Sequence, residues 1–491
     1  MIEFFSYILH KKNRIFLYCA LATSVVYFII LRILFPIPGF FADSYTYIQV
    51  ARDHSAISFR PVEYAILINF FKTISTSDIA LIAAQFFSNL LANLFLFFTF
   101  TWLFNFRKIY RIIFFILVIC NPLYLLYSNY ILTDSFFSAF TVAWFVLLVW
   151  LIYWPKWYIH ILQLILLAFL FSLRYNAIIF PVFAALAIFF SRQALYQKLV
   201  LIAAGFILIL LLVIRTTQKT EKYTGTRTFS AFSGWQIANN ALHILRWQMV
   251  DTTDINDKET RNIIKFSRSY FDTATVLSDP SFVTSDYMWD KKSPLKTYMV
   301  FFASKKAKTS YFATWTALGP IYNNFGRTVI FKKPISYVKY FVLPNAKQYF
   351  IPDLEAYNAY FGNTDTIHPI ARTFFHYNNN TLGPKRTIIY TLVFKPCKYI
   401  FPLLNVLFLV LAFIYLLGKK YKKEPRFFNQ ALLCFGAFYT ANFFFIVLVA
   451  PTVFRYHVFI LTLLFPFILL LLQKLTSFKA AGIKIGGASL S

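Results

Sequence analysis

The chain has few acidic residues: 19 Asp and Glu stand against 48 Lys and Arg in 491 residues, a formal net charge of +29. It has only four cysteines and no CxxC pair, which argues against a disulfide scaffold or a cysteine-rich zinc site. It also has no GxxxxGK[ST] loop, HExxH, GxSxG or dinucleotide-binding motif. Coupling to ATP, zinc proteolysis and serine hydrolysis are therefore disfavoured.

Apolar residues, by contrast, are abundant. They make up 59% of the chain, aromatics alone 21%, and the mean hydropathy is +0.60, too apolar for an ordinary soluble domain. Ten segments approach the ~20 residues that cross a bilayer, so we expect an all-α polytopic membrane protein with about 10–12 transmembrane helices. The segments are residues 15–35, 79–104, 110–127, 134–154, 158–173, 176–190, 199–214, 399–417, 427–450 and 455–473.

Lys and Arg cluster in alternate gaps between these segments, which sets an orientation because short cytoplasmic loops retain cations. The clusters are Lys11, Lys12 and Arg14; Arg107, Lys108 and Arg111; Lys156; Arg192 and Lys198; Lys419, Lys420, Lys422, Lys423 and Arg426; and Lys474 and Lys479. With the N-terminus inside, the external parts are residues 36–78, 128–133, 174–175, 216–397 and 451–454. The net charge is then partly topological and requires no nucleic acid partner.

Three regions follow from this topology. Residues 1–215 form an N-terminal transmembrane module with a first external loop at 36–78. Residues 216–397 are long enough for an external domain, and their apolar spacing favours helices. Residues 398–491 return to the membrane and end in a cytoplasmic tail.

Two external acids are candidates for chemistry. Asp43 lies just after the first span, and if this stretch is helical Asp43, Tyr47 and Ala51 share one face. Its carboxylate suits a general base or a ligand to a divalent cation, although an Asp there also suits a helix N-cap. Asp134, at the external start of the fourth span, is an ordinary capping residue or faces Asp43 across a cavity.

Arginines on the outer side are the second indication, because positive-inside topology should deplete them there. Arg60, Arg174 and Arg455 lie in external segments. Each is explained singly by snorkelling to headgroups, but together they favour an anionic ligand. A guanidinium ~4 Å from a phosphate oxygen is worth about 4 kcal/mol at an effective dielectric of 20. Further candidates for substrate binding, with interfacial or solvated roles as the alternative, are Tyr45, Tyr47, His54, Glu63 and Tyr456.

Five short segments, in this order, carry a resemblance to a known family. They are ADSYTYIQVA, FRPVEYAILI, LTDS, LRYNA and FRYHVFILTLLFP. The chain resembles the GT-C glycosyltransferases, specifically the bacterial relatives of protein O-mannosyltransferases and of the lipid A aminoarabinose transferase. The likeness covers roughly 250 residues of the membrane part, and because each motif is short, their order carries the weight. Residues 216–397 match no family pattern.

The resemblance implies a GT-C-like fold and inverting transfer of a sugar from a polyprenyl-phosphate donor to a hydroxyl of a glycan, lipid or protein. Asp43 would then be the base or the carboxylate that orients the acceptor, and Asp134 would support the site. The donor phosphate would be bound by Arg60, Arg174 and Arg455. A divalent cation is a candidate cofactor, but Ser44 replaces a second acid that many members have. A composition rich in Phe, Ile, Lys and Asn, without retrieval signals, favours a bacterial inner membrane over an ER membrane. The cation pattern then places the N-terminus in the cytoplasm and the active site in the periplasm.

Two other functions remain open. A polysaccharide polymerase or ligase also joins many spans to a large external loop. A flippase or transporter of lipid-linked sugars is the alternative from another class, and we would expect pseudo-repeated halves and charges near the bilayer midplane, neither of which the sequence displays.

Overall fold

The computed structural model describes all residues except 1, 274–281, 306–309, 359–365, 382–386 and 483–491. The described residues are mostly helical, and among them the only β-type pairings are three isolated bridges. The chain is therefore an all-α polytopic membrane protein, as its run of apolar segments predicts.

Eight helical stretches in the described part of the chain are long and apolar enough to cross a membrane. Two shorter apolar stretches, Trp157–Leu173 and Tyr175–Phe190, complete the ten predicted segments. The long ones comprise α2 (Lys11–Leu34), α5 (Ile79–Leu103), α6 with α7 (Lys108–Ile119 and Pro122–Ser128), α8 (Thr133–Tyr153), α11 (Leu195–Thr224), α20 with α21 (Thr387–Phe394 and Cys397–Leu417), α22 (Arg426–Val449) and α23 (Val458–Gly482). The shorter pair contains α9 (Trp157–Leu173), η1 (Tyr175–Ile179) and α10 (Phe180–Phe190).

α5 and α8 pack side by side at the centre of the bundle, where a buried polar network fixes the chain that enters α8. Gln85 Nε2 donates to the carbonyls of Ser128 and Tyr130 at 2.7 and 2.8 Å, and Asn89 Nδ2 donates to Ser135 Oγ at 2.9 Å. Buried amides in an apolar bundle must find such partners. The network holds the start of α8, and with it Asp134, in place.

A second hydrophobic core lies in the external helices. It is built mainly from α12 (Ser233–Leu245), α13 (Lys258–Thr273), α14 (Asp286–Trp289), α15 (Pro294–Ser304) and α16 (Tyr311–Lys332). α12 and α16 approach closely because Gly234 faces the backbone of Gly319: a Cβ on Gly234 would lie 1.9 Å from the Gly319 carbonyl oxygen. This close contact brings α12 and α16 together in the external core.

The structure divides residues 216–397 differently from the sequence-based boundaries. α11 runs unbroken through position 215, so the membrane module and the external part share one helix. At the other end, Leu354, Tyr357, Phe374 and Phe394 belong to the core of the membrane bundle rather than to the external core. After α18 (Leu343–Phe350), the physical reason is the burial of these individual apolar side chains against the bundle.

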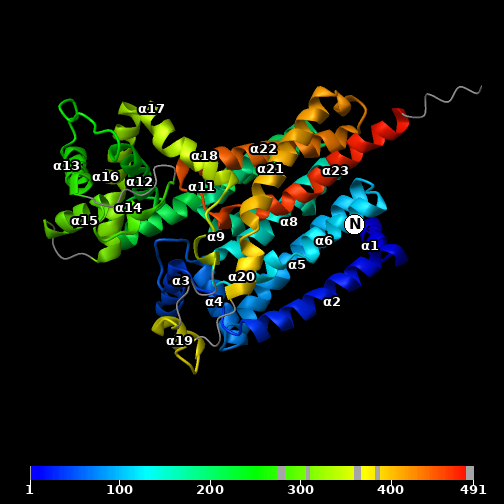
Figure 1. Cartoon of the computed structure of the whole chain (residues 1–491), viewed down its shortest axis with the longest axis horizontal. Helices are drawn as coiled ribbons and strands as arrows, with labels where there is room; N and C mark the ends of the chain where they lie inside the picture. The colour runs from blue at the N-terminus through cyan, green and yellow to red at the C-terminus, as the bar shows by residue number, and fades with distance from the viewer. Residues whose placement is uncertain (1, 274–281, 306–309, 359–365, 382–386, 483–491) are drawn as a thin grey trace, which may run out of the picture.

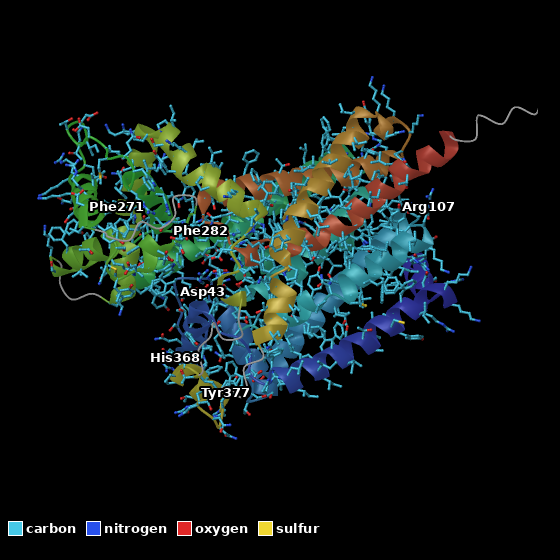
Figure 2. All side chains as sticks on the ribbon, viewed as in Figure 1. Asp43, Arg107, Phe271, Phe282, His368 and Tyr377 are labelled. Carbon is cyan, nitrogen blue, oxygen red and sulfur yellow. The ribbon has the colours of Figure 1, made fainter. Side chains whose placement is uncertain are left out.

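The external helices and the first loop lie at one end of the bundle (Figure 1). The first loop contributes α3 (Ala42–Asp53) and α4 (Glu63–Ile74), and α19 (Pro369–Phe375) packs beside α3. Figure 2 shows Asp43 at this end and Arg107 at the opposite end, near the N-terminus. The remaining elements are α1 (Ile2–Leu9), α17 (Pro334–Tyr337), η2 (Val338–Val342), η3 (Glu355–Asn358), η5 (Lys420–Lys422) and η6 (Phe454–Tyr456).

Candidate functional site

Helix starts position both predicted acids. α3 begins at Ala42, and the hydroxyl of Ser44 accepts from the Phe41 backbone N–H at 2.9 Å, which satisfies the donor of the N-cap residue. Asp43 lies one residue inside the first turn, with Tyr47 buried on the same face, as predicted. Asp134 has the same place in α8. Neither acid is the N-cap residue of its helix, and both bind arginine side chains instead.

Three arginines from distant segments meet these acids. Arg60, just before α4, places Nη2 2.8 Å from Asp43 Oδ1. Arg174, between α9 and η1, donates to Asp134 Oδ1. Arg455, in η6, lies between the acids, with Nη1 3.0 Å from Asp43 Oδ2 and 3.8 Å from Asp134 Oδ2. The predicted convergence of Asp43 with Arg174 and Arg455 at one place is confirmed.

A third acid, Glu355, completes the cluster and was not predicted. Its Oε2 lies 3.1 Å from Arg455 Nε, and its backbone is in the left-handed region with φ of 48°. That conformation is uncommon for a residue other than glycine and often occurs at functional sites. No local motif marks Glu355 in the sequence, because its partner is 100 residues further along.

The arginines line a cavity of about 690 Å³ between the membrane bundle and the external helices. Asp43 and Asp134 do not line it, whereas Glu355 does. The other polar or aromatic lining residues include Tyr47, Tyr175, Phe232, Gln236, Asp286, Trp289, Asp353 and Tyr456. The three guanidinium groups are therefore accessible to a ligand in the cavity. Two of the carboxylates that neutralise them, those of Asp43 and Asp134, do not line the cavity.

The acids of the cluster differ in basicity. Burial raises the pKa of Asp43, but the charges of Arg60 and Arg455 outweigh it and bring the pKa to about 2. Burial also raises the pKa of Glu355, and Arg455 opposes this only in part, so the net shift is upward. Asp43 is consequently a weak base held as an anion, and Glu355 is the more basic carboxylate at the cavity.

Two of the five predicted substrate-binding residues line the cavity. They are Tyr47 and Tyr456, and the guanidinium carbon of Arg174 lies 4.9 Å from the ring centroid of Tyr456. The other three do not line it. Tyr45 lies two residues from Asp43 and packs on Phe40 and His368, His54 is exposed at the end of α3, and Glu63 lines a separate small pocket with Arg215 and Lys219.

The acids of this cluster do not fit a divalent cation in the arrangement observed. Among the described residues no three His, Cys, Asp or Glu side chains are grouped as cation ligands. Asp43, Asp134 and Glu355 each face a guanidinium, so their charge is already matched. An anion that contacts the arginines suits this chemistry better than a cation between the acids.

An apolar groove of about 750 Å³ lies between α10 and α22. Its walls include Val182, Leu433 and Phe444, which are exposed in apolar helices and so face lipid. A narrow intermediate pocket shares Phe445 with this groove and Arg455 with the main cavity. The lipid-facing groove thus lies close to the guanidiniums, with this small pocket between them.

Comparison with known proteins identifies no relative. No family model matches the chain, and neither the curated proteins nor the solved structures contain a match to it.

Proposed function

We propose that the chain is an inverting glycosyltransferase that moves a sugar from a polyprenyl-phosphate donor to a hydroxyl acceptor. The observation that carries this proposal is that Arg60, Arg174 and Arg455 meet at a cavity that lies close to a lipid-facing apolar groove. A lipid-linked sugar phosphate has three parts, and each has a matching environment: the prenyl chain in the groove, the phosphate at the arginines and the sugar in the cavity. The resemblance in sequence to GT-C enzymes points to the same reaction.

The proposed reaction is a single displacement. The acceptor hydroxyl oxygen forms a bond to the anomeric carbon, while the bond from that carbon to the phosphate oxygen breaks and leaves its electron pair on the phosphate. Arg174 and Arg455 stabilise the departing charge. Glu355 takes the hydroxyl proton, because it lines the cavity and is more basic than Asp43.

Asp43 and Asp134 then serve as positioning residues. Each holds one or two guanidiniums through short ion pairs and does not itself line the cavity. This reassigns the role of base that sequence resemblance gives to Asp43. The distribution of cations further supports an outward-facing site in a bacterial inner membrane, with the N-terminus and Arg107 on the cytoplasmic side.

The test uses the full chain in lipid nanodiscs with undecaprenyl phosphate carrying a radiolabelled hexose, supplied as a panel of hexoses, and a membrane extract as acceptor. Wild type should produce a labelled product. The double variant Arg174→Gln with Asp134→Asn removes one charge of each sign, so the buried site stays balanced. Its transfer rate should fall at least about a hundredfold, because the phosphate loses a guanidinium.

The matched control removes the exposed pair Arg52 and Asp53, whose side chains are 53% and 39% exposed, and should leave transfer unchanged. Absence of product from wild type with every donor would count against the transferase. Movement of labelled lipid across the bilayer without any glycosyl product would support the flippase instead. Product in which many sugar units are joined would favour the polymerase.

A further inference from the structure

We infer that the external wall of the cavity binds a neutral sugar ring, so the acceptor is a glycan. This inference rests on the proposed function for the reaction that it serves. The wall consists of Phe232, Ser233, Gln236, Asp286 and Trp289, all from the external helices or the chain that enters them. The sequence alone leaves the nature of the acceptor open, since residues 216–397 have no recognisable pattern.

Trp289 differs from its neighbours in exposure. Trp235 and Trp315 are fully buried, and their indole N–H groups donate to the carbonyls of Trp315 and Ala231 at 2.9 Å each. Trp289 is 45% exposed and lines the cavity. The external core already has two satisfied tryptophans, so a third that is left open toward a cavity points to contact with a ligand.

The ring of Trp289 is supported from behind and from the side. It lies against Trp315 with centroids 5.5 Å apart and planes 24° apart, and Phe232 meets it edge-on at 5.7 Å. Trp315 in turn stacks on Trp235 at 3.6 Å. The ammonium group of Lys296 lies 4.2 Å from the Trp315 centroid and makes a cation–π contact with this stack. A platform held in this way loses little freedom when a ligand binds.

The chemistry around Trp289 matches a sugar. A pyranose has an apolar face of C–H groups that covers an aromatic ring, and hydroxyls at its edge that seek hydrogen bonds. Here the rim offers the hydroxyl of Ser233, the amide of Gln236 and the carboxylate of Asp286. Among the described residues that line this wall none is a Lys or Arg, and the nearest ammonium, that of Lys296, lies 5.8 Å from the Trp289 centroid. Asp286 disfavours an anionic ligand.

The location also fits an acceptor rather than the donor. The guanidinium carbon of Arg60 lies 5.1 Å from the Phe232 centroid, on the route from Trp289 to the arginine cluster. A sugar on Trp289 therefore shares the cavity with a phosphate at Arg455 and with Glu355. One hydroxyl of the bound glycan is then directed toward the carboxylate that takes its proton.

The experiment is saturation-transfer NMR on the full chain in nanodiscs, with cellobiose, maltose, chitobiose and mannobiose as neutral probes and a Ser/Thr hexapeptide for comparison. At least one disaccharide should receive saturation from wild type. Trp289→Ala should weaken its binding about tenfold or more, which is about 1.4 kcal/mol, and Trp289→Phe should keep most of it. Gln236→Leu should weaken binding severalfold, because a hydrogen bond to the sugar is lost.

Binding of undecaprenyl phosphate, measured on the same preparations, separates the two proposals. It should be equal in wild type, Trp289→Ala and Gln236→Leu, which also establishes that each variant is folded. Saturation of no disaccharide, or of the peptide alone, would overturn the glycan acceptor while leaving the donor site intact. Equal disaccharide binding by wild type and Trp289→Ala would overturn it too. Failure of wild type to bind undecaprenyl phosphate would instead count against the transferase.

Discussion

Replacing Glu355 with glutamine tests which carboxylate of the cluster accepts the proton. The substitution keeps the size of the side chain and its carbonyl oxygen but removes the base. Asp43→Asn is the comparison, because Asp43 contacts the same Arg455 but lies outside the cavity wall and has a pKa of about 2. At pH 7 such a group is about five pH units too weak to be an effective base.

The two variants should differ in size of effect and in the parameter that changes. A positioned general base contributes typically 10²–10⁴ in rate, or about 3–5 kcal/mol at 1.36 kcal/mol per tenfold, and Glu355→Gln should lower kcat by that amount. Asp43→Asn removes charge-assisted hydrogen bonds to Arg60 and Arg455, worth about 1.5–3 kcal/mol each. We therefore expect it to raise the donor KM roughly tenfold or more through misplaced guanidiniums.

The assay is the initial rate of transfer from undecaprenyl-phosphate hexose as a function of pH. A base works only when deprotonated, so the wild-type rate should rise with pH through the pKa of Glu355, which lies above the ordinary 4.5. Glu355→Gln should lose this acid limb, and Asp43→Asn should retain it. Asp353→Asn, on the same cavity wall, is the matched control. It should keep kcat and the acid limb, with the limb moved to lower pH, because the charge of Asp353 helps to raise the pKa of Glu355.

The reasoning is refuted if the pattern is reversed. Loss of the acid limb in Asp43→Asn, with a normal limb and kcat in Glu355→Gln, would mean that Asp43 is the base after all. The arginines would then have to move away from Asp43 when donor binds. Equal and complete loss in Asp353→Asn would indicate that any charge change at this wall disables the site.

Three further predictions concern the fold. Gly234→Ala should destabilise the external helices and expose them to limited proteolysis, because its Cβ would meet the Gly319 carbonyl at 1.9 Å, whereas Gly319→Ala, with nothing within 4 Å of its Cβ, should be tolerated. Arg32→Gln should lower the free energy of unfolding by about 3–5 kcal/mol, measured by a tryptophan-fluorescence melt. The reason is that Asp78, 2% exposed and 2.8 Å from Arg32, loses its ion-pair partner. A change below ~1 kcal/mol would contradict this. The folded-state pKa of Asp43 is depressed, so its stabilising contribution, about 2 kcal/mol from the shift of 3.8 to about 2, is present above pH 3.8 and lost as pH falls through about 2. The melting difference between wild type and Asp43→Asn should accordingly be constant from pH 7 to pH 5 and shrink in stronger acid.

The membrane helices were predictable because span length and apolar content are local properties of the sequence. The convergence of Asp43 with Arg174 and Arg455 was also predictable, since topology places all three on one side of the membrane. Glu355 was not, because its role depends on a pairing with Arg455 that only the folded chain creates. The exposure of Trp289 was not predictable either, because the sequence does not show which of the three tryptophans Trp235, Trp289 and Trp315 are buried in the external core.

The differences between the predicted and the observed positions have geometric causes. Tyr45 follows Asp43 by two residues, and on a helix that spacing sends the side chain to nearly the opposite face. On that face Tyr45 packs against His368 and points away from the arginine cluster. Packing crosses the predicted boundary at 397, because Leu354, Tyr357 and Phe374 place side chains in the core of the membrane bundle. These apolar residues are scattered in a polar stretch, so no apolar run marks them in the sequence.

Within the cluster, the charges of Arg60, Arg174 and Arg455 are cancelled by those of Asp43, Asp134 and Glu355. Ordinary phospholipids surround the chain in excess, yet their headgroups find little net attraction there, since each would have to displace a carboxylate that belongs to the protein. On the proposed function, a lipid phosphate must compete with these carboxylates for the arginines. Only a lipid that makes further contacts with the protein can then displace them.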